Sequence, residues 1–76
     1  MTPAQLFTRA GILLYGDEFT APLAKALNVE RSTVRKMADG KSRVMPGMWL
    51  ELAALIQDRE AALPALKVAV LRAAEG

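Results

Sequence analysis

The stretch 30–43 carries more positive charge than any other part of the chain. Its net charge is +3, whereas residues 1–29 and 44–76 carry 0 and −1. The cations in it are Arg31, Arg35, Lys36, Lys41 and Arg43. Guanidinium and ammonium groups pair with phosphate oxygens, and the arginine fork matches two acceptors on the edge of one guanine. Such a cluster favours a polyanionic partner, although an ordinary solvated surface has the same composition.

The chain contains neither Cys nor His. Disulfides, thiol nucleophiles, Cys/His zinc sites and the commonest general base are therefore excluded. The remaining acid–base candidates are scattered carboxylates, Asp17 with Glu18 and Asp58 with Glu60, which we interpret as helix-end and surface charges. We expect no catalysis, no metal, no cofactor and no small-molecule ligand.

A helix that starts after Glu30 is predicted to position the first of these cations. Val34 and Met37 fall three residues apart, as on the buried side of a helix. The other directions are taken by polar residues that stay in solvent, namely Arg31, Ser32, Arg35 and Lys36. Asp39-Gly40 is a typical C-terminal signal, so the helix has one buried side and one basic side.

A second short helix is predicted just before it. Leu23, Ala24 and Leu27 recur at helical spacing, and this register breaks at Asn28. Asn tolerates a left-handed backbone, so Asn28 can end the helix where Gly would be expected. Ala24 is small enough for two backbones to approach, and Val29 follows the turn as an apolar plug. The stretch 20–40 therefore predicts two helices that cross steeply after a sharp turn.

Six apolar residues of this stretch form a pattern that resembles the helix-turn-helix of the phage repressor and Cro-type (XRE-like) regulators. The pattern has Leu-Ala near its start, Leu before the turn and Val after it, matched here by Leu23, Ala24, Leu27, Val29, Val34 and Met37. The chain departs from it at Asn28, where the family prefers Gly, and at Thr20, where many members place a phosphate-binding Gln. The resemblance implies a lambda-repressor-like DNA-binding domain.

On a helix that enters the major groove, the residues near its N-terminal end face the base edges. These residues are Glu30, Arg31, Ser32, Arg35 and Lys36. Arg31 and Arg35 can each pair with guanine through two hydrogen bonds, and Glu30 can cap the helix or accept a bond from a cytosine amino group. Each cation has the alternative interpretation of a solvated surface group, and Ser32 can simply favour the first turn.

Phosphate contacts are expected from the loop after this helix, as in the family that the stretch resembles. The predicted phosphate-binding residues are Thr20, Thr33, Lys41, Ser42 and Arg43. Thr33 can also simply favour the first turn of its helix.

A longer helix is predicted before the turn region, over residues 3–15. Thr2 is a good cap, Pro3 suits the first helical position, Gln5 can reach back, and Gly16 ends the helix. Its broad apolar face consists of Leu6, Phe7, Ala10, Leu13 and Leu14. Phe19 is expected to plug the core, and Thr20 is expected to cap the next helix.

Two more helices are predicted after the basic loop. The fourth runs from Pro46 to about Ala62, and its apolar face is formed by Trp49, Leu52, Ala53 and Ile56. Pro64 would cost a backbone hydrogen bond, so the chain is expected to bend near Leu63 and form a fifth helix through Ala74. That helix is apolar nearly all round and is predicted to dimerise through Leu63, Leu66, Val68, Val70 and Leu71. Alternatively, Leu66, Val70 and Leu71 complete the monomer core.

A chain of 76 residues without a linker predicts a single domain, residues 1–76, folded as an all-α compact bundle of about five short helices. No apolar run approaches a membrane span and no secretion signal is recognised, so we expect a cytoplasmic protein. The sequence predicts a dimeric, sequence-specific double-stranded DNA-binding regulator of phage or bacterial type. It would repress from a palindromic operator, with autoregulation plausible. The alternative is an antitoxin-like or adaptor protein that uses its last helix to hold a protein partner.

Overall fold

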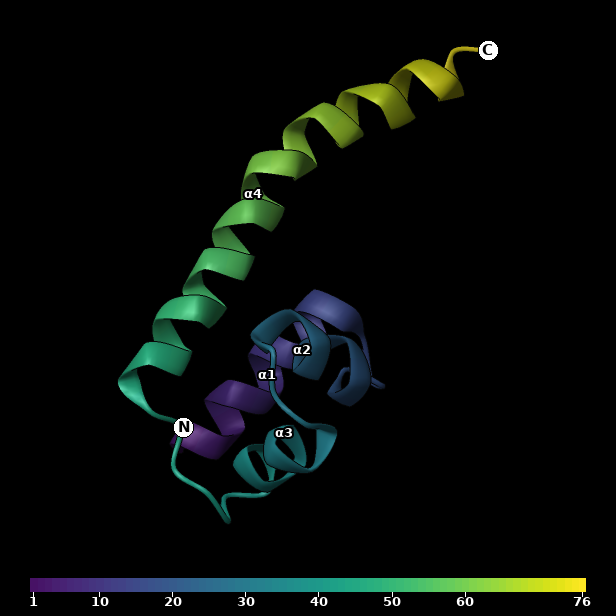
Figure 1. Ribbon diagram of the computed structural model, residues 1–76. Coiled ribbons are helices and arrows are strands. Elements are labelled where there is room, and N and C mark those ends of the chain that lie inside the picture. Colours follow the sequence, from purple (N-terminus) through teal and green to yellow (C-terminus); the bar gives the residue numbers. More distant parts are fainter.

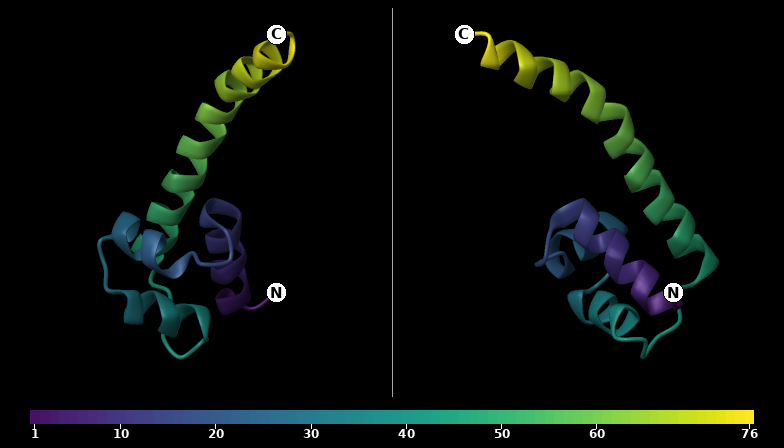
Figure 2. Two further views of the ribbon diagram at one scale, coloured as in Figure 1. Left: turned by 90° about the vertical axis from the view of Figure 1, so that its right-hand side faces the viewer. Right: turned by 180° about the vertical axis from the view of Figure 1, so that it is seen from behind.

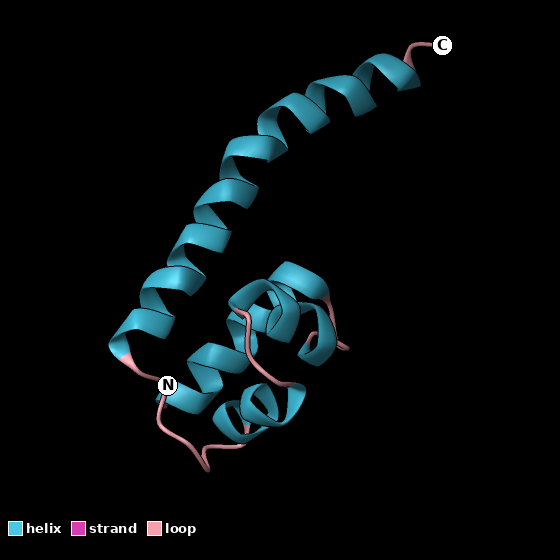
Figure 3. Ribbon diagram, in the orientation of Figure 1, coloured by secondary structure: helices cyan, strands magenta, loops and turns pink.

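The computed structural model describes residues 1–76 and contains four α-helices and no strand (Figure 3). The helices are α1 (Pro3–Tyr15), α2 (Thr20–Leu27), α3 (Arg31–Ala38) and α4 (Pro46–Ala74). In Figure 1, α1 and α2 lie against the first half of α4, and α3 packs on α1 and α2, so that the four elements form one lobe. None of the four helices is both long enough and apolar enough to cross a membrane.

The ends of α1 follow from its sequence. The Gln5 amide donates to the Thr2 hydroxyl over 3.1 Å, and the Thr2 amide donates to the Gln5 side chain over 2.8 Å, which together form the expected capping box. Gly16 ends the helix at a φ of 87°, and its amide donates to the Ile12 carbonyl over 2.7 Å. The next helix differs from expectation, because Phe19 and not Thr20 occupies the N-cap position of α2, and no side chain caps it.

The predicted division into a fourth and a fifth helix is wrong. Residues 46–74 form one helix of 29 residues with Pro64 inside it. A proline removes one backbone hydrogen bond and crowds the carbonyl four residues earlier, which bends a helix and need not end it. Figure 1 shows α4 curving along its length, so that its last turns run in a different direction from its first.

The second half of α4 leaves the lobe. We call residues 60–74 the distal segment; all of them are exposed, and both views of Figure 2 show this segment standing clear of the other helices. The radius of gyration is 14.7 Å and the molecule measures 50 × 25 × 21 Å, whereas a compact chain of this length would have a radius of gyration of about 11 Å. The bundle is therefore compact only as far as residue 59, and Leu66, Val70 and Leu71 do not complete its core.

The core lies where α1, α2, α3 and the start of α4 meet. Its ten buried apolar residues are Phe7, Leu14, Phe19, Leu23, Ala24, Leu27, Val34, Met37, Val44 and Leu52. Trp49 is half-buried and packs edge-on against Phe7, with ring centroids 6.3 Å apart. The buried faces of α1 and α4 contain fewer residues than predicted. Leu6 and Leu13 of α1 are 49% and 73% exposed, and Ala53 of α4 is also exposed.

An arginine of α4 holds that helix against the end of α1. Nη1 of Arg59 donates to the Leu14 carbonyl over 2.7 Å, and the guanidinium carbon lies 5.6 Å from the centroid of the Tyr15 ring. The last turn of α1 has no basic residue of its own, and a cation at that end of a helix is favoured by the helix dipole. This contact was not predicted from the sequence. Arg59 supplies the positive charge that α1 lacks, although it lies 45 residues away from Leu14 along the chain.

Gly11 is predicted to be irreplaceable because the Phe19 ring lies directly against it. A Cβ at position 11 would lie 2.8 Å from Cγ and from Cε2 of that ring, and nearer still to Cδ2. Overpacking of this kind costs about 1–3 kcal/mol, more than the roughly 1 kcal/mol that Ala gains over Gly in a helix. Gly11→Ala is therefore expected to lower the free energy of unfolding, measured by urea denaturation.

Gly47→Ala is the matched control, because nothing lies within 4 Å of a Cβ at that helical position. It is expected to leave the free energy of unfolding unchanged or to raise it. If Gly11→Ala stabilised the protein as Gly47→Ala does, the packing of Phe19 on α1 would be wrong.

Candidate nucleic-acid interface

The turn between α2 and α3 depends on a left-handed residue. Asn28 has φ 58° and ψ 46° and is the only residue other than glycine with a positive φ, as predicted for this position. Its amide donates to the Lys25 carbonyl over 3.2 Å, and the next amide, of Val29, donates to the Ala24 carbonyl over 3.0 Å. This pair of bonds forms a Schellman motif, which closes α2 and turns the chain within two residues. The turn therefore sets the direction in which α3 leaves.

α3 is anchored by its apolar side and presents a polar side to solvent. Val34 is fully buried and Met37 is 3% exposed, and the Thr8 hydroxyl donates to the Ala38 carbonyl over 3.3 Å, which ties α1 to the end of α3. Four of the five residues predicted to read bases are side chains of this helix, all exposed: Arg31, Ser32, Arg35 and Lys36. They lie on adjacent ridges, because residues four apart share one side of a helix.

Two predicted residues on α3 are placed differently from the rest. Glu30 is at the N-cap position with an extended backbone, and its carbonyl accepts from the amides of Thr33 and Val34. Its side chain makes no cap bond, so the carboxylate is free in solvent beside the first turn. Thr33 is half-buried, unlike the four exposed residues of α3, and among the predicted phosphate-binding residues only Thr20 is also half-buried.

The basic loop after α3 is held at both ends. At its start Gly40 has a φ of 79°, and the amides of Gly40 and Lys41 donate to the carbonyls of Met37 and Lys36, which is a second Schellman motif. At its end Val44 is buried in the core. The side chains between these anchors, Lys41, Ser42 and Arg43, are all exposed.

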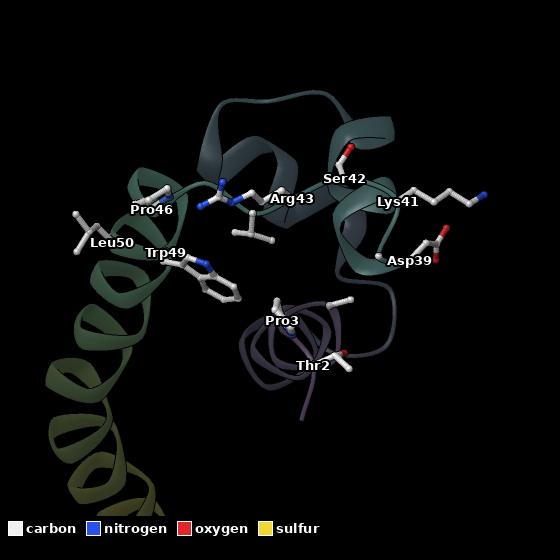
Figure 4. A pocket seen from close by; sticks show the side chains of 12 residues that line it. Thr2, Pro3, Asp39, Lys41, Ser42, Arg43, Pro46, Trp49 and Leu50 are labelled. Carbon is white, nitrogen blue, oxygen red and sulfur yellow. The ribbon is translucent and has the colours of Figure 1, made fainter.

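These loop residues form one wall of an open groove between the loop, the start of α1 and the start of α4 (Figure 4). In that view Lys41 extends away from the groove, whereas Arg43 lies toward Pro46 and Trp49. The two cations therefore reach in opposite directions along the loop. Trp49 also lines the groove, but its edge-on packing against Phe7 gives it a place in the fold.

A separate depression brings together α3 and the corner between α1 and α2. It is lined by Asp17, Glu18, Thr20, Ala21, Arg31 and Arg35. Two acidic residues and two arginines thus line the same depression, together with the predicted phosphate-binding Thr20 at the start of α2. None of the side-chain hydrogen bonds of the structure joins these carboxylates to the guanidinium groups. Asp17 and Glu18 were predicted to be helix-end or surface charges, without a connection to α3. Only the folded geometry makes this connection, since Glu18 and Arg31 are 13 positions apart.

The predicted dimerisation residues do not share one face of the distal segment. A shallow apolar groove is lined by Leu63, Pro64, Leu66, Lys67, Val70 and Leu71. Val68 is 48% exposed but is not part of this groove, because its position on the helix lies nearly opposite Leu66 and Val70. The groove continues the side of α4 that packs on the lobe through Leu52 and Arg59, past the point where the lobe ends.

We predict that the left-handed turn limits what position 28 accepts. Asn28→Ala is expected to lower the free energy of unfolding by about 1–2 kcal/mol, because a left-handed backbone costs an ordinary residue that much. Asn28→Gly is the matched control and is expected to be neutral or stabilising, since it also removes the side chain but accepts the backbone. Urea denaturation of both variants measures the difference; an Ala variant as stable as the Gly variant would show that the turn is not left-handed.

The surface formed by α3, the loop and the α1–α2 corner carries exposed guanidinium, ammonium and hydroxyl groups on a rigid base. Groups of these types bind phosphates and base edges. The chain matches no protein-family model, no curated protein and no solved structure. Its own geometry therefore supplies the grounds on which a function is proposed.

Proposed function

We propose that the protein is a sequence-specific DNA-binding regulator in which α2 and α3 act as a helix-turn-helix and α3 enters the major groove. The observation that carries the proposal is that α3 is buried on one side and exposed on the other. Val34 and Met37 fix the helix to the core, while Arg31, Ser32, Arg35 and Lys36 leave the opposite side polar and exposed. A major groove about 12 Å wide admits one α-helix, and the side chains near its N-terminal end then meet the base edges.

Arg31 and Arg35 are the residues proposed to carry most of the specificity. They are one helical turn apart, so their guanidinium groups lie along one ridge and reach neighbouring base pairs. Each has the donor geometry for the two acceptors of guanine, worth about 1–3 kcal/mol of discrimination per pair. Ser32 and Lys36 occupy the adjacent ridge. The Glu30 carboxylate makes no cap hydrogen bond and is proposed to accept a hydrogen bond from a cytosine amino group.

Phosphate contacts are proposed from both sides of α3. The loop supplies Lys41, Ser42 and Arg43, and the start of α2 supplies Thr20, whose neighbouring amides have no side-chain cap and can donate to an anion. Lys41 and Arg43 extend in opposite directions (Figure 4), so they suit two different phosphates. Thr20 and Thr33 are both half-buried and are the weakest members of the proposed set.

The partner proposed for the apolar groove of the distal segment is a second copy of this chain. One α3 of eight residues offers few base contacts, whereas two copies related by a twofold axis would place two such helices about 34 Å apart, in successive major grooves. In a twofold dimer the two copies pair through the same surface. Here that surface is the groove, which continues the side of α4 that packs on the lobe. A standard interface contributes about 20–30 residues a side, so a pair of single helices is weak in solution and assembles mainly on DNA.

In this proposal the regulator is a repressor that covers a palindromic operator and excludes polymerase. Occupancy of the operator then follows the concentration of the protein. Autoregulation follows where the operator lies before its own gene. A second candidate function, an antitoxin-like or adaptor protein, is favoured by the same exposed distal segment and requires no contact between α3 and DNA.

Replacement of Arg31 or Arg35 by Ala is predicted to weaken binding to a selected operator by about 1–3 kcal/mol. The operator is first obtained by selection from random duplex DNA. Each replacement is expected to relax the preference at one position of each half-site and to affect a scrambled duplex much less. Affinities for the two duplexes, measured by fluorescence anisotropy at one salt concentration, give both effects.

Arg72→Ala is the control, because it removes the same charge at an exposed position near the end of α4, far from α3. An equal loss of affinity on both duplexes would reassign that arginine to the phosphate backbone. Failure of the wild-type protein to select any sequence would favour the adaptor function.

Polar substitution of the distal groove is predicted to abolish cooperative binding without unfolding the protein. In Leu66→Gln/Val70→Gln both changed side chains are already more than half exposed, so the circular dichroism spectrum should be unchanged. The variant is expected to bind a single half-site as wild type does and to lose the additional affinity of a duplex with two half-sites.

Val68→Gln is the matched control, since Val68 is an exposed valine of the same segment outside the groove, and it should keep the cooperativity. Cooperative binding by the double variant would place the dimer contact elsewhere on the chain.

A further inference from the structure

The depression beside α3 contains two carboxylates that the proposed contacts with DNA do not use. Asp17 and Glu18 line it together with Arg31 and Arg35, the two arginines assigned to guanine. All four side chains are exposed. The two negative and two positive charges cancel within this space, although the stretch 30–43 as a whole carries +3. The other three cations of that stretch, Lys36, Lys41 and Arg43, do not line this depression.

A role of these carboxylates in capping α2 does not explain their position. Phe19 is the N-cap of α2, no side chain makes a cap bond there, and the first turn contains no acidic residue. Both carboxylates precede the helix in the turn after Gly16 and are free to face α3. Their place beside the guanidinium groups is the feature that needs a function.

We propose that Asp17 and Glu18 are positioning residues that orient Arg31 and Arg35 for guanine, and this inference rests on the proposed function. A guanidinium group has five N–H donors in a planar fork, and a guanine occupies two of them. The structure has no hydrogen bond between these groups, but all four side chains are exposed, and their rotation within the shared depression can bring a carboxylate to one of the donors that remain. Each arginine is then held between a carboxylate and a base.

Positioning of this kind has opposite effects on the two classes of DNA. On the operator, an arginine that is already oriented loses less side-chain freedom on binding, and immobilising such a side chain otherwise weakens affinity by about two- to tenfold. On any other sequence the arginines find no guanine in place, and the carboxylates only repel the phosphates. Asp17 and Glu18 thus raise affinity for the operator and lower it for other sequences.

The first test needs no DNA. In the free protein, ¹⁵N relaxation of the arginine Nε–Hε groups reports how freely each guanidinium moves. The order parameters of Arg31 and Arg35 are expected to exceed that of Arg72 in the wild type and to fall toward it in Asp17→Asn/Glu18→Gln. Unchanged order parameters in the double variant would overturn the inference, whether or not the protein binds DNA.

The second test compares the affinity of the same double variant for the selected operator and for a scrambled duplex. We expect operator affinity to fall about threefold and scrambled-duplex affinity to rise about threefold, so that their ratio falls about tenfold. The matched control is Glu60→Gln/Glu75→Gln, which removes two exposed carboxylates, one in α4 and one at its C-cap, and should leave the ratio unchanged.

The directions of the two changes separate positioning from simpler effects. A rise on both duplexes would mean that the carboxylates only repel phosphate, and a fall on both would mean that they only support the fold; either result overturns the inference. Absence of binding by the wild-type protein would overturn the proposed function, while the order parameters would still decide whether the carboxylates hold the arginines.

Discussion

The polar surface of α3 depends on the burial of Val34 and Met37 beneath it. An eight-residue helix is too short to be stable alone, because nucleation is costly and each further residue adds little. α3 therefore exists because Val34, with no exposed area, and Met37, with 3%, pack into the core beside Leu23 and Phe7. The two Schellman motifs, at Asn28 and at Gly40, fix where the helix begins and ends. These apolar contacts determine which side of α3 faces solvent, and Arg31 and Arg35 lie on that side.

Much of this arrangement is visible in the sequence because local rules decide it. The capping box of Thr2, the glycine that ends α1, the left-handed Asn28 and the burial of Val34 and Met37 were all predicted and are confirmed. Each rests on residues that are close together in the chain, where spacing and turn chemistry are enough. The assignment of Phe19 to the core is also confirmed, since a single large aromatic residue between two helices has few other places to go.

The features that were missed depend on residues far apart in the chain. The bond from Arg59 to the Leu14 carbonyl and the shared depression of Glu18 with Arg31 arise only when the helices have packed. The error at Pro64 has a different origin. A proline inside a helix costs about 3 kcal/mol, but it is flanked here by strong helix formers, Ala61, Ala62 and Leu63 before it and Ala65, Leu66 and Lys67 after it. The helix continues through Pro64 and gains about 22 Å of length beyond the lobe. The roles of the surface residues in binding are not decided by the fold and stay predictions.

The contact between Gly11 and Phe19 has a consequence for how this fold can vary. The ring occupies the space that any side chain at position 11 would need, so the two positions form a single volume shared between α1 and the start of α2. A chain that places Ala or Ser at position 11 must reduce the side chain at position 19 as well, and a chain that keeps the aromatic ring must keep glycine. Related sequences should therefore vary at these two positions together. This paired variation would identify distant relatives of the fold even where the cations of α3 have been replaced.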